Sequence, residues 1–318
     1  MSARGKHLKG RYCAERFVMN RREFLKSGVI TGLGLAIPNS LDVFLKSTTA
    51  SEKVDLVVAQ GLSPARMVES AIGAMGGIKS FIARGDIVVI KPNIGWDRTP
   101  EQAANTNPEV VSSLVTLCYD AGAKTVKVFD RTVDDARRCY KQSGIADAAT
   151  AAGGKVSFID DRKFKTVKLN GLALKEWPLY TEILEADKII NAPIAKTHGL
   201  ASLTMAMKNW MGIMGGSRGR IHQRLDECLP DIASVIKPTL TVLDAIRILT
   251  ANGPQGGNLR DVKELNTVIV SRDQVAVDAF GATFFGLQGS DLGYVKTAAR
   301  IGLGIMDLSK VTIKTIRC

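Results

Sequence analysis

Short apolar runs alternate with helical patterns along most of the chain, and this alternation constrains the fold more than any other feature of the sequence. The run Ile87–Ile90 is apolar at every position, which is typical of a strand buried on both faces of a parallel sheet. Similar runs at 125–129, 187–191 and 239–243 are separated by helical patterns. The sequence therefore predicts an α/β fold, with a mostly parallel, doubly wound sheet and helices on both faces.

Helix-start signals support the same alternation. Ser63, Asn107 and Asp273 each stand directly before a helical pattern, and the first two are followed by proline, so we predict all three as N-caps. The 318 residues suffice for one large domain or two modest ones. We expect residues 51–318 to form the α/β domain, either as one unit or as two sub-domains of about 51–160 and 161–318.

Residues 1–50 are predicted to be a leader. Asn20-Arg-Arg-Glu-Phe-Leu-Lys26, followed by the apolar, glycine-rich run 27–37, resembles the twin-arginine export signal. The apolar run is too short for a membrane span of roughly 20 residues. The resemblance implies a periplasmic or other extracytoplasmic protein, with the twin-arginine translocase as a partner and the membrane contacted only through an uncleaved leader. A cytosolic amphipathic start is the alternative, and both Met1 and Met19 fit as the start of translation.

The charge balance favours a small anionic ligand over a nucleic acid. The formal net charge is +12, and half of this surplus lies in residues 1–50. The remainder contains no run of five or six basic residues and no alternation of basic with aromatic residues. We therefore expect no nucleic-acid partner.

The segment 191–216 gathers more polar and cationic groups between apolar elements than any other. An apolar strand leads into Lys196, Thr197 and His198, which we predict on a small-residue turn, and an amphipathic run then carries Lys208 and Asn209. Ligands of open α/β sheets bind where strands end at their carboxyl edge. The predicted catalytic residues are Lys196, His198, His222 and Asp244; the predicted anion- or cofactor-binding residues are Lys91, Asn93, Asn191, Lys208 and Asn209; and His198 and His222 are the candidate metal ligands.

Each assignment has a structural alternative. The two histidines could be structural residues that only form hydrogen bonds within the fold. The lysines could lie on a solvated face, and Asp130 or Asp244 could cap a turn. Met207, Met211 and Met214 share a helix face, which suits core packing better than a copper site. The cysteines form no C-x-x-C pair, so an iron–sulfur cluster is not supported.

Several segments together resemble the domain-of-unknown-function 362 family. They include Val88-Val-Ile-Lys-Pro-Asn93, Asn191-Ala-Pro-Ile-Ala-Lys-Thr-His198 and Met207-Lys-Asn-Trp-Met-Gly212, within a similarity from about residue 54 to the C-terminus. Some members of that family carry a four-cysteine, ferredoxin-like module, which this chain lacks. The first half is also similar in fold to the nickel-pincer lactate racemase group, which implies cofactor-binding parts for Lys196, His198 and His222.

These patterns favour an exported enzyme that acts on an anionic small molecule or uses a metal or organometallic cofactor. Lys91, Lys196 and Lys208 would hold negative charge, and the histidines would transfer protons or bind metal. Asp244 would orient a histidine. The alternative is a non-catalytic extracytoplasmic carrier or assembly factor for a metal or cofactor.

Overall fold

The computed structural model describes residues 54–318, so the predicted leader lies outside the described residues. The strands are β1 (Leu56–Gln60), β2 (Ile87–Pro92), β3 (Thr125–Val128), β4 (Lys155–Val156), β5 (Phe164–Lys168), β6 (Glu176–Tyr180), β7 (Lys188–Ala192), β8 (Ile194–His198), β9 (Ser202–Thr204), β10 (Leu240–Leu249), β11 (Val262–Ser271) and β12 (Ile313–Arg317). The helices are α1 (Pro64–Ala74), α2 (Pro108–Asp120), α3 (Ala136–Gln142), α4 (Ile145–Ala151), α5 (Thr181–Leu184), α6 (Ala206–Asn209), α7 (Leu225–Val235), α8 (Gln274–Ala282) and α9 (Gly293–Arg300).

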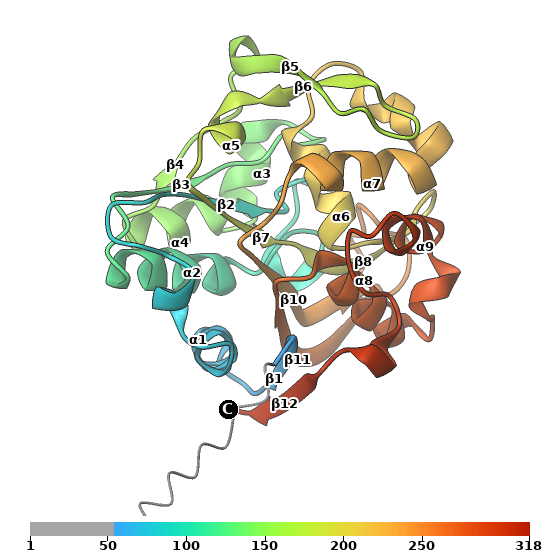
Figure 1. The fold of residues 1–318 in the computed structure, drawn as a ribbon. Helices are drawn as coiled ribbons and strands as arrows, with labels where there is room; N and C mark the ends of the chain where they lie inside the picture. Colours follow the sequence, from blue (N-terminus) through green and yellow to red (C-terminus); the bar gives the residue numbers. More distant parts are fainter. Residues whose placement is uncertain (1–53) are drawn as a thin grey trace, which may run out of the picture. The chain divides into compact units, whose positions relative to one another are not determined.

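A ten-stranded mixed sheet forms the centre of this region (Figure 1). Its main path runs β12-β1-β11-β10-β7-β2-β3-β4, and the β8–β9 hairpin joins it through β10. Within residues 54–318, six of the nine strand pairings in this sheet are parallel. The predicted mostly parallel α/β architecture is therefore confirmed.

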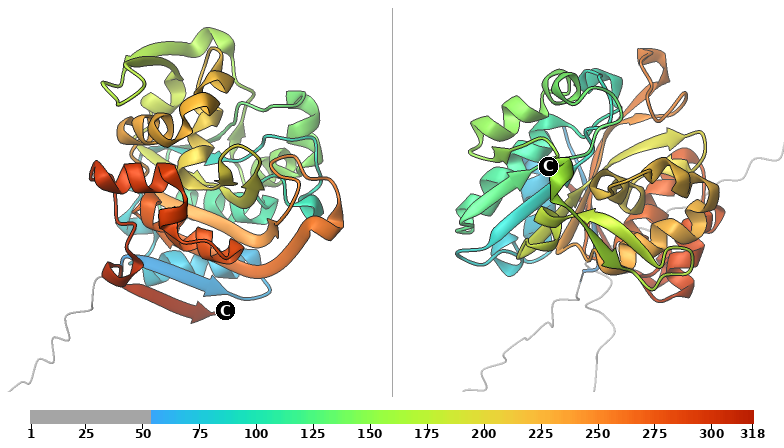
Figure 2. Two further views of the ribbon diagram at one scale, coloured as in Figure 1. Left: turned by 90° about the vertical axis from the view of Figure 1, so that its right-hand side faces the viewer. Right: turned by 90° about the horizontal axis from the view of Figure 1, so that it is seen from above.

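Helices cover both faces of the sheet, as predicted. Helices α1 to α4 pack on one face with side chains such as Val88 and Ile90, whereas α6 to α9 pack on the other with Val89. Seen from above, the two groups of helices lie on opposite sides of the strands (Figure 2). Alternate residues of β2 thus enter two different cores, which explains why its sequence is apolar at every position.

The three predicted N-caps are confirmed. The side chains of Ser63, Asn107 and Asp273 each accept a hydrogen bond from a backbone N–H in the first turn of the helix that follows. No helix among residues 54–318 is both long enough and apolar enough to cross a membrane.

Two local predictions were wrong. Lys196 and His198 lie on strand β8 and not on a turn, because this segment pairs with both β10 and β9 after Pro193 separates it from β7. The strand predicted at 239–243 continues to Leu249, so Asp244 lies inside β10 and not at its end. The extension of β11 from Val262, which pairs with the second half of β10, accounts for the additional length.

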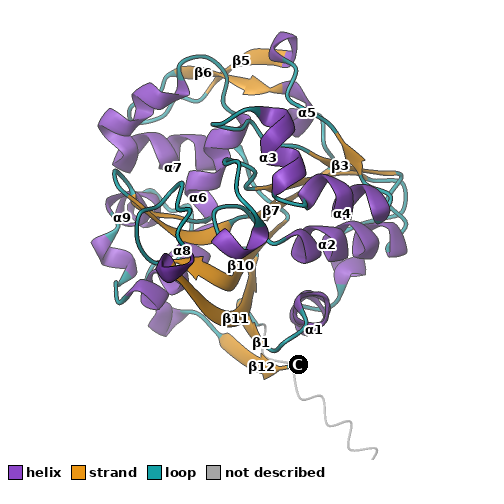
Figure 3. Ribbon diagram, turned by 180° about the vertical axis from the view of Figure 1, so that it is seen from behind, coloured by secondary structure: helices purple, strands orange, loops and turns teal. Residues whose placement is uncertain are grey.

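Strands β5 and β6 form a separate antiparallel hairpin between β4 and β7 in the sequence (Figure 3). Most side chains of β5 are exposed or half-buried, so its residues lack the apolar run by which the buried strands were recognised.

Candidate functional site

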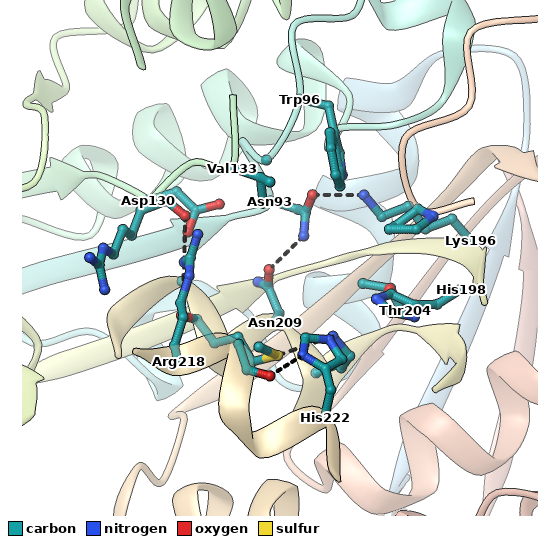
Figure 4. A pocket seen from close by; sticks show the side chains of 17 residues that line it. Asn93, Trp96, Asp130, Val133, Lys196, His198, Thr204, Asn209, Arg218 and His222 are labelled. Carbon is teal, nitrogen blue, oxygen red and sulfur yellow. Dashed lines mark hydrogen bonds between the residues drawn. The ribbon is translucent and has the colours of Figure 1, made fainter. Parts of the chain in front are cut away.

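A pocket of about 340 Å³ lies where the parallel strands end at their carboxyl edge. Six of the predicted site residues line it: Asn93, Lys196, His198, Lys208, Asn209 and His222. Figure 4 shows five of them, Asn93, Lys196, His198, Asn209 and His222, around the pocket. Lys91 and Asn191 are fully buried beside the pocket but do not line it, and Asp244 does not line it either.

The β8–β9 hairpin forms one wall of the pocket. Lys196 and His198 are two residues apart on β8, so their side chains emerge on the same face of the strand. Lys196 lies opposite Thr204 on β9, which adds a third side chain to that face. The hydroxyl of Thr204 is buried and has no hydrogen-bond partner within residues 54–318.

The ammonium group of Lys196 has two protein acceptors. Nζ donates to Asn93 Oδ1 at 3.1 Å and to the carbonyl oxygen of Ala104. The side chain is 1% exposed. Burial, and after it the neighbouring Lys208 charge, lower the pKa of Lys196 to about 7.

Lys208 is a second buried lysine that lines the pocket. Its Nζ lies 3.0 Å from Met211 Sδ and 3.2 Å from His222 Nε2. Burial, and after it the charge of Arg218, lower the pKa of Lys208 to about 7. Each of the two lysines can therefore gain or lose a proton near neutral pH.

Hydrogen bonds indicate the protonation of both histidines. The N–H groups of Leu200 and Ala201 donate to His198 Nδ1, so the proton of the neutral ring is on Nε2. His222 lies with Nδ1 2.9 Å from the carbonyl oxygen of Gly219, which accepts its proton and leaves Nε2 to accept from Lys208. Burial, followed by the charge of Lys208, lowers the pKa of His198 to about 3 and also lowers the pKa of His222.

The two imidazole rings stack, with centroids 5.5 Å apart and an angle of 17° between their planes. Ligation of a metal through His198 would disturb this arrangement, because Nδ1 accepts two backbone N–H groups and Nε2 carries the proton. Among residues 54–318 there is no group of three or more His, Cys, Asp or Glu side chains placed to hold a metal ion. These donors do not fit a bare metal cation.

A chain of side-chain amides holds the base of the pocket. Asn93 Nδ2 donates to Asn209 Oδ1 at 3.2 Å, and Asn209 Nδ2 donates to Asn191 Oδ1 at 2.8 Å. Asn191 in turn donates to the carbonyl oxygen of Ala206 at 2.9 Å. Since Asn93 accepts from Lys196, every amide in this chain has a defined orientation, and Asn191 acts on the pocket through Asn209.

Beneath the amides lies a buried ion pair. Lys91 Nζ is 2.9 Å from Asp130 Oδ1, and it also donates to Asn209 Oδ1 at 3.1 Å. Gly212 closes over this pair: a Cβ atom at that position would lie 1.7 Å from Asp130 Oδ1. Lys91 therefore neutralises Asp130 and positions Asn209, and it does not present its charge to the pocket.

Asp244 has a different place from the one predicted. Within the described residues its carboxylate accepts from the backbone N–H groups of Asn107 and Ile246, at 2.7 and 3.0 Å, and from neither histidine. Burial raises the pKa of Asp244 to about 6. Its contacts hold the end of the loop 94–107, which borders the pocket.

The structure adds residues that were not assigned to the site from the sequence. Arg218 donates to the carbonyl oxygens of Arg131, Thr132 and Met211, which fixes its guanidinium at the pocket wall. Its nearness to His222 in the sequence was the only signal for it. Trp96 is contributed by the loop 94–107, and loops of this length in a compact domain often have a function.

Three of the four methionines in the segment 191–216 serve packing, as does Cys118. Met205, Met207 and Met214 are fully buried in the core, whereas Met211 is half-buried at the pocket. Cys118 is buried and unpaired, and burial raises the pKa of its thiol to about 12.

Fold and site together define an α/β protein with a cationic ligand pocket at the carboxyl edge of its sheet. The chain matches the family described as "Domain of unknown function (DUF362)" over residues 88–283, which is more than half of its length. It belongs to this family.

A curated relative and two solved structures are similar to this chain. It is 27% identical over 237 residues to a thylakoid-associated protein of Synechocystis sp., with 72% of each chain covered. A Thermotoga maritima protein has 10% identity and a TM-score of 0.40, covering 61% of this chain and 54% of its own. The lactate racemase apoprotein of Thermoanaerobacterium thermosaccharolyticum has 10% identity and a TM-score of 0.42, covering 73% of this chain and 57% of its own. The chain thus spans less than two thirds of either solved structure, and likeness at this level assigns neither ligand nor reaction.

Proposed function

We propose that this protein is an enzyme that moves a proton on a small organic anion, with Lys196 as the acid–base group. The observation that carries the proposal is the environment of the Lys196 amine, which is buried, bordered by two acceptors and placed at the wall of a ligand-sized pocket.

The two hydrogen-bond acceptors beside Lys196 Nζ are the number that a neutral, basic amine requires. A neutral amine has two N–H groups and one lone pair. Asn93 Oδ1 and the carbonyl oxygen of Ala104 can take both N–H groups, which leaves the lone pair for the ligand. A pKa of about 7 populates both forms at neutral pH, as acid–base catalysis requires.

The other cations suit an anionic ligand. Arg218 keeps its charge at any physiological pH, and its three backbone contacts hold it in place before a ligand arrives. Lys208 is the second cation, and its pKa of about 7 would rise when an anion binds beside it. Arg218 and Lys208 would thus hold the anion while Lys196 transfers the proton.

We also propose that the protein acts outside the cytoplasm, in contact with a membrane or close to one. The paired arginines Arg21 and Arg22, with the apolar run that follows them, support export. The thylakoid-associated relative supports a location at or beyond a membrane.

Any cofactor of this site would be anionic. Lys196, Lys208 and Arg218 repel a bare metal cation. The ring lone pair on His222 Nε2 faces the pocket but already accepts a hydrogen bond from Lys208. A negatively charged organic cofactor or metal complex is compatible with the same cations. Retention of such a molecule without turnover would correspond to the carrier function.

Hydrogen–deuterium exchange on bound anions tests the proposal. Candidate carboxylates and phosphate esters would first be screened for binding by calorimetry, and those that bind would be incubated with the protein in heavy water. We expect at least one of them to exchange a carbon-bound proton, as seen by loss of its NMR signal. Lys196→Met should abolish the exchange, whereas Lys165→Met, at an exposed position on β5, should not.

Two results would contradict the proposal. Undiminished exchange in Lys196→Met would remove Lys196 from the reaction. Tight binding without exchange of any carbon-bound proton would instead favour the carrier.

A further inference from the structure

We propose that the ligand of this pocket carries a flat apolar group next to its anionic group, and that Trp96 is the residue that selects it. This inference rests on the proposed function, because it names the class of anion that the same pocket binds.

The backbone of Trp96 is held in place before any ligand binds. Its backbone N–H and that of Gly95 both donate to Asn105 Oδ1, at 3.0 and 2.9 Å, and its carbonyl oxygen accepts from Asn105 Nδ2 at 2.8 Å. Asn105 is 2% exposed, so these bonds are shielded from water. The backbone that carries the indole is thereby fixed at the pocket, which lowers the entropy cost of ordering this segment when a ligand binds.

The surroundings of Trp96 distinguish it from the other two tryptophans. Trp210 is fully buried and donates its indole N–H to Gln274, and Trp177 donates to the carbonyl oxygen of Gly215 outside the pocket. Trp96 lines the pocket and is half-buried. Its apolar surface is therefore available to a ligand.

Other apolar groups also line the pocket. Val133 lines it and is 61% exposed, and Met211 and Pro254 line it as well. Trp96 lies at the top of Figure 4 and His222 at the bottom, so an indole and the stacked imidazole pair border the pocket from opposite sides. Thioether, proline and neutral aromatic surfaces all favour contact with a flat apolar body.

An inorganic anion would make no use of these groups. Phosphate or sulfate would need only Lys196, Lys208 and Arg218, and would leave the indole and Val133 in contact with water. A phenyl-sized body attached to the anion would cover both, and burial of apolar surface is the main source of affinity in such pockets.

The test compares anions that share a head group and differ in their body. Calorimetry would measure the affinities of methyl phosphate and phenyl phosphate, and of acetate and benzoate, for the full chain. We expect the phenyl member of at least one pair to bind at least about tenfold more tightly. Trp96→Ala should reduce this ratio to about threefold or less, and Trp96→Phe should retain most of it.

Two further variants keep the test independent of folding. Val133→Ser changes an exposed side chain, so the protein should fold normally while the ratio falls about twofold. Trp177→Phe makes the same chemical change as Trp96→Phe at a half-buried position outside the pocket and should leave the ratio unchanged. Thermal melts of all variants would identify any general loss of structure.

Equal binding of the methyl and phenyl members, or an equal loss of both in Trp96→Ala, would overturn the inference while the anion site itself stands. If no member of either pair binds, both the inference and the proposed anion site fail.

Discussion

Replacing Lys196 with methionine should stabilise the protein at neutral pH, although it removes two hydrogen bonds. Methionine has a similar length and no charge, so the main change is that the buried ammonium disappears. This variant therefore tests whether the amine is as strongly desolvated as its surroundings imply.

The size of the effect follows from the pKa. A fall from 10.5 in the unfolded chain to about 7 in the folded protein makes folding less favourable by about 4 kcal/mol at pH 7. Losing the donor to Asn93 Oδ1 and to the Ala104 carbonyl oxygen costs about 1 kcal/mol each. The variant should therefore be more stable than the wild type by about 2 kcal/mol at pH 7.

The sign of the pH dependence provides the sharper test. Between about pH 7 and 10.5 the unfolded chain binds more protons at Lys196 than the folded protein does, so the stability of the wild type rises with pH in this window. At pH 9 the cost of burying Lys196 falls to about 2 kcal/mol, which the two lost hydrogen bonds offset. The advantage of the variant should then be close to zero.

Urea denaturation of both proteins at several pH values would measure these differences. Lys165→Met, at an exposed position, is the control and should show no comparable dependence on pH. A Lys196→Met protein that is less stable than the wild type by a constant amount at all pH values would refute the reasoning, because it would mean that the amine is charged and well solvated.

Three further predictions concern the rest of the site. Gly212→Ala should lower the free energy of unfolding by about 3 kcal/mol or more, because its Cβ would meet Asp130 Oδ1 at 1.7 Å and Lys91 Nζ at 2.6 Å; an unchanged urea midpoint would contradict this. Asn209→Leu removes a partner from Lys91 and breaks the amide chain toward Lys196, so it should both destabilise the protein by about 2 kcal/mol and weaken anion binding, whereas normal affinity in calorimetry would show that the amides do not position the site. A tenfold increase in salt concentration should weaken anion binding at least about twofold, and affinity that is independent of salt would argue against charge as its source.

Local patterns were sufficient to predict most of the architecture. Strand β2 is buried along nearly its whole length, which makes its sequence apolar at successive positions. The cap residues Asn107 and Asp273 bond to backbone groups only a few residues away, so the residue type and its position are visible in the sequence. The extension of β10 beyond Leu243 depends on pairing with β11, between residues from Asp244 and Val268 to Leu249 and Val262, and no local pattern records such pairing.

The same distinction separates Asn93 and Lys196, which line the pocket, from Asp244, which does not. Asn93 and Lys196 were selected because polar groups at strand ends face the ligand crevice, and both line the pocket. Asp244 was selected by the same rule, but its strand does not end there, and its carboxylate meets the backbone N–H of Asn107 instead. A polar residue can therefore be assigned to the ligand crevice from the sequence only where the end of its strand is predicted correctly.

Charge is the property of this site that residue types describe least well. The sequence assigns one positive charge each to Lys196 and Lys208, but burial brings both pKa values to about 7. Among the charged residues that line the pocket, Arg218 keeps its charge, whereas the protonation of Lys196 and Lys208 responds to the charge of whatever binds beside them. An anion that enters will draw protons onto those lysines and strengthen its own binding. The pocket can therefore present a base to a neutral part of a ligand and a cation to its charged part, which three permanently charged residues could not do.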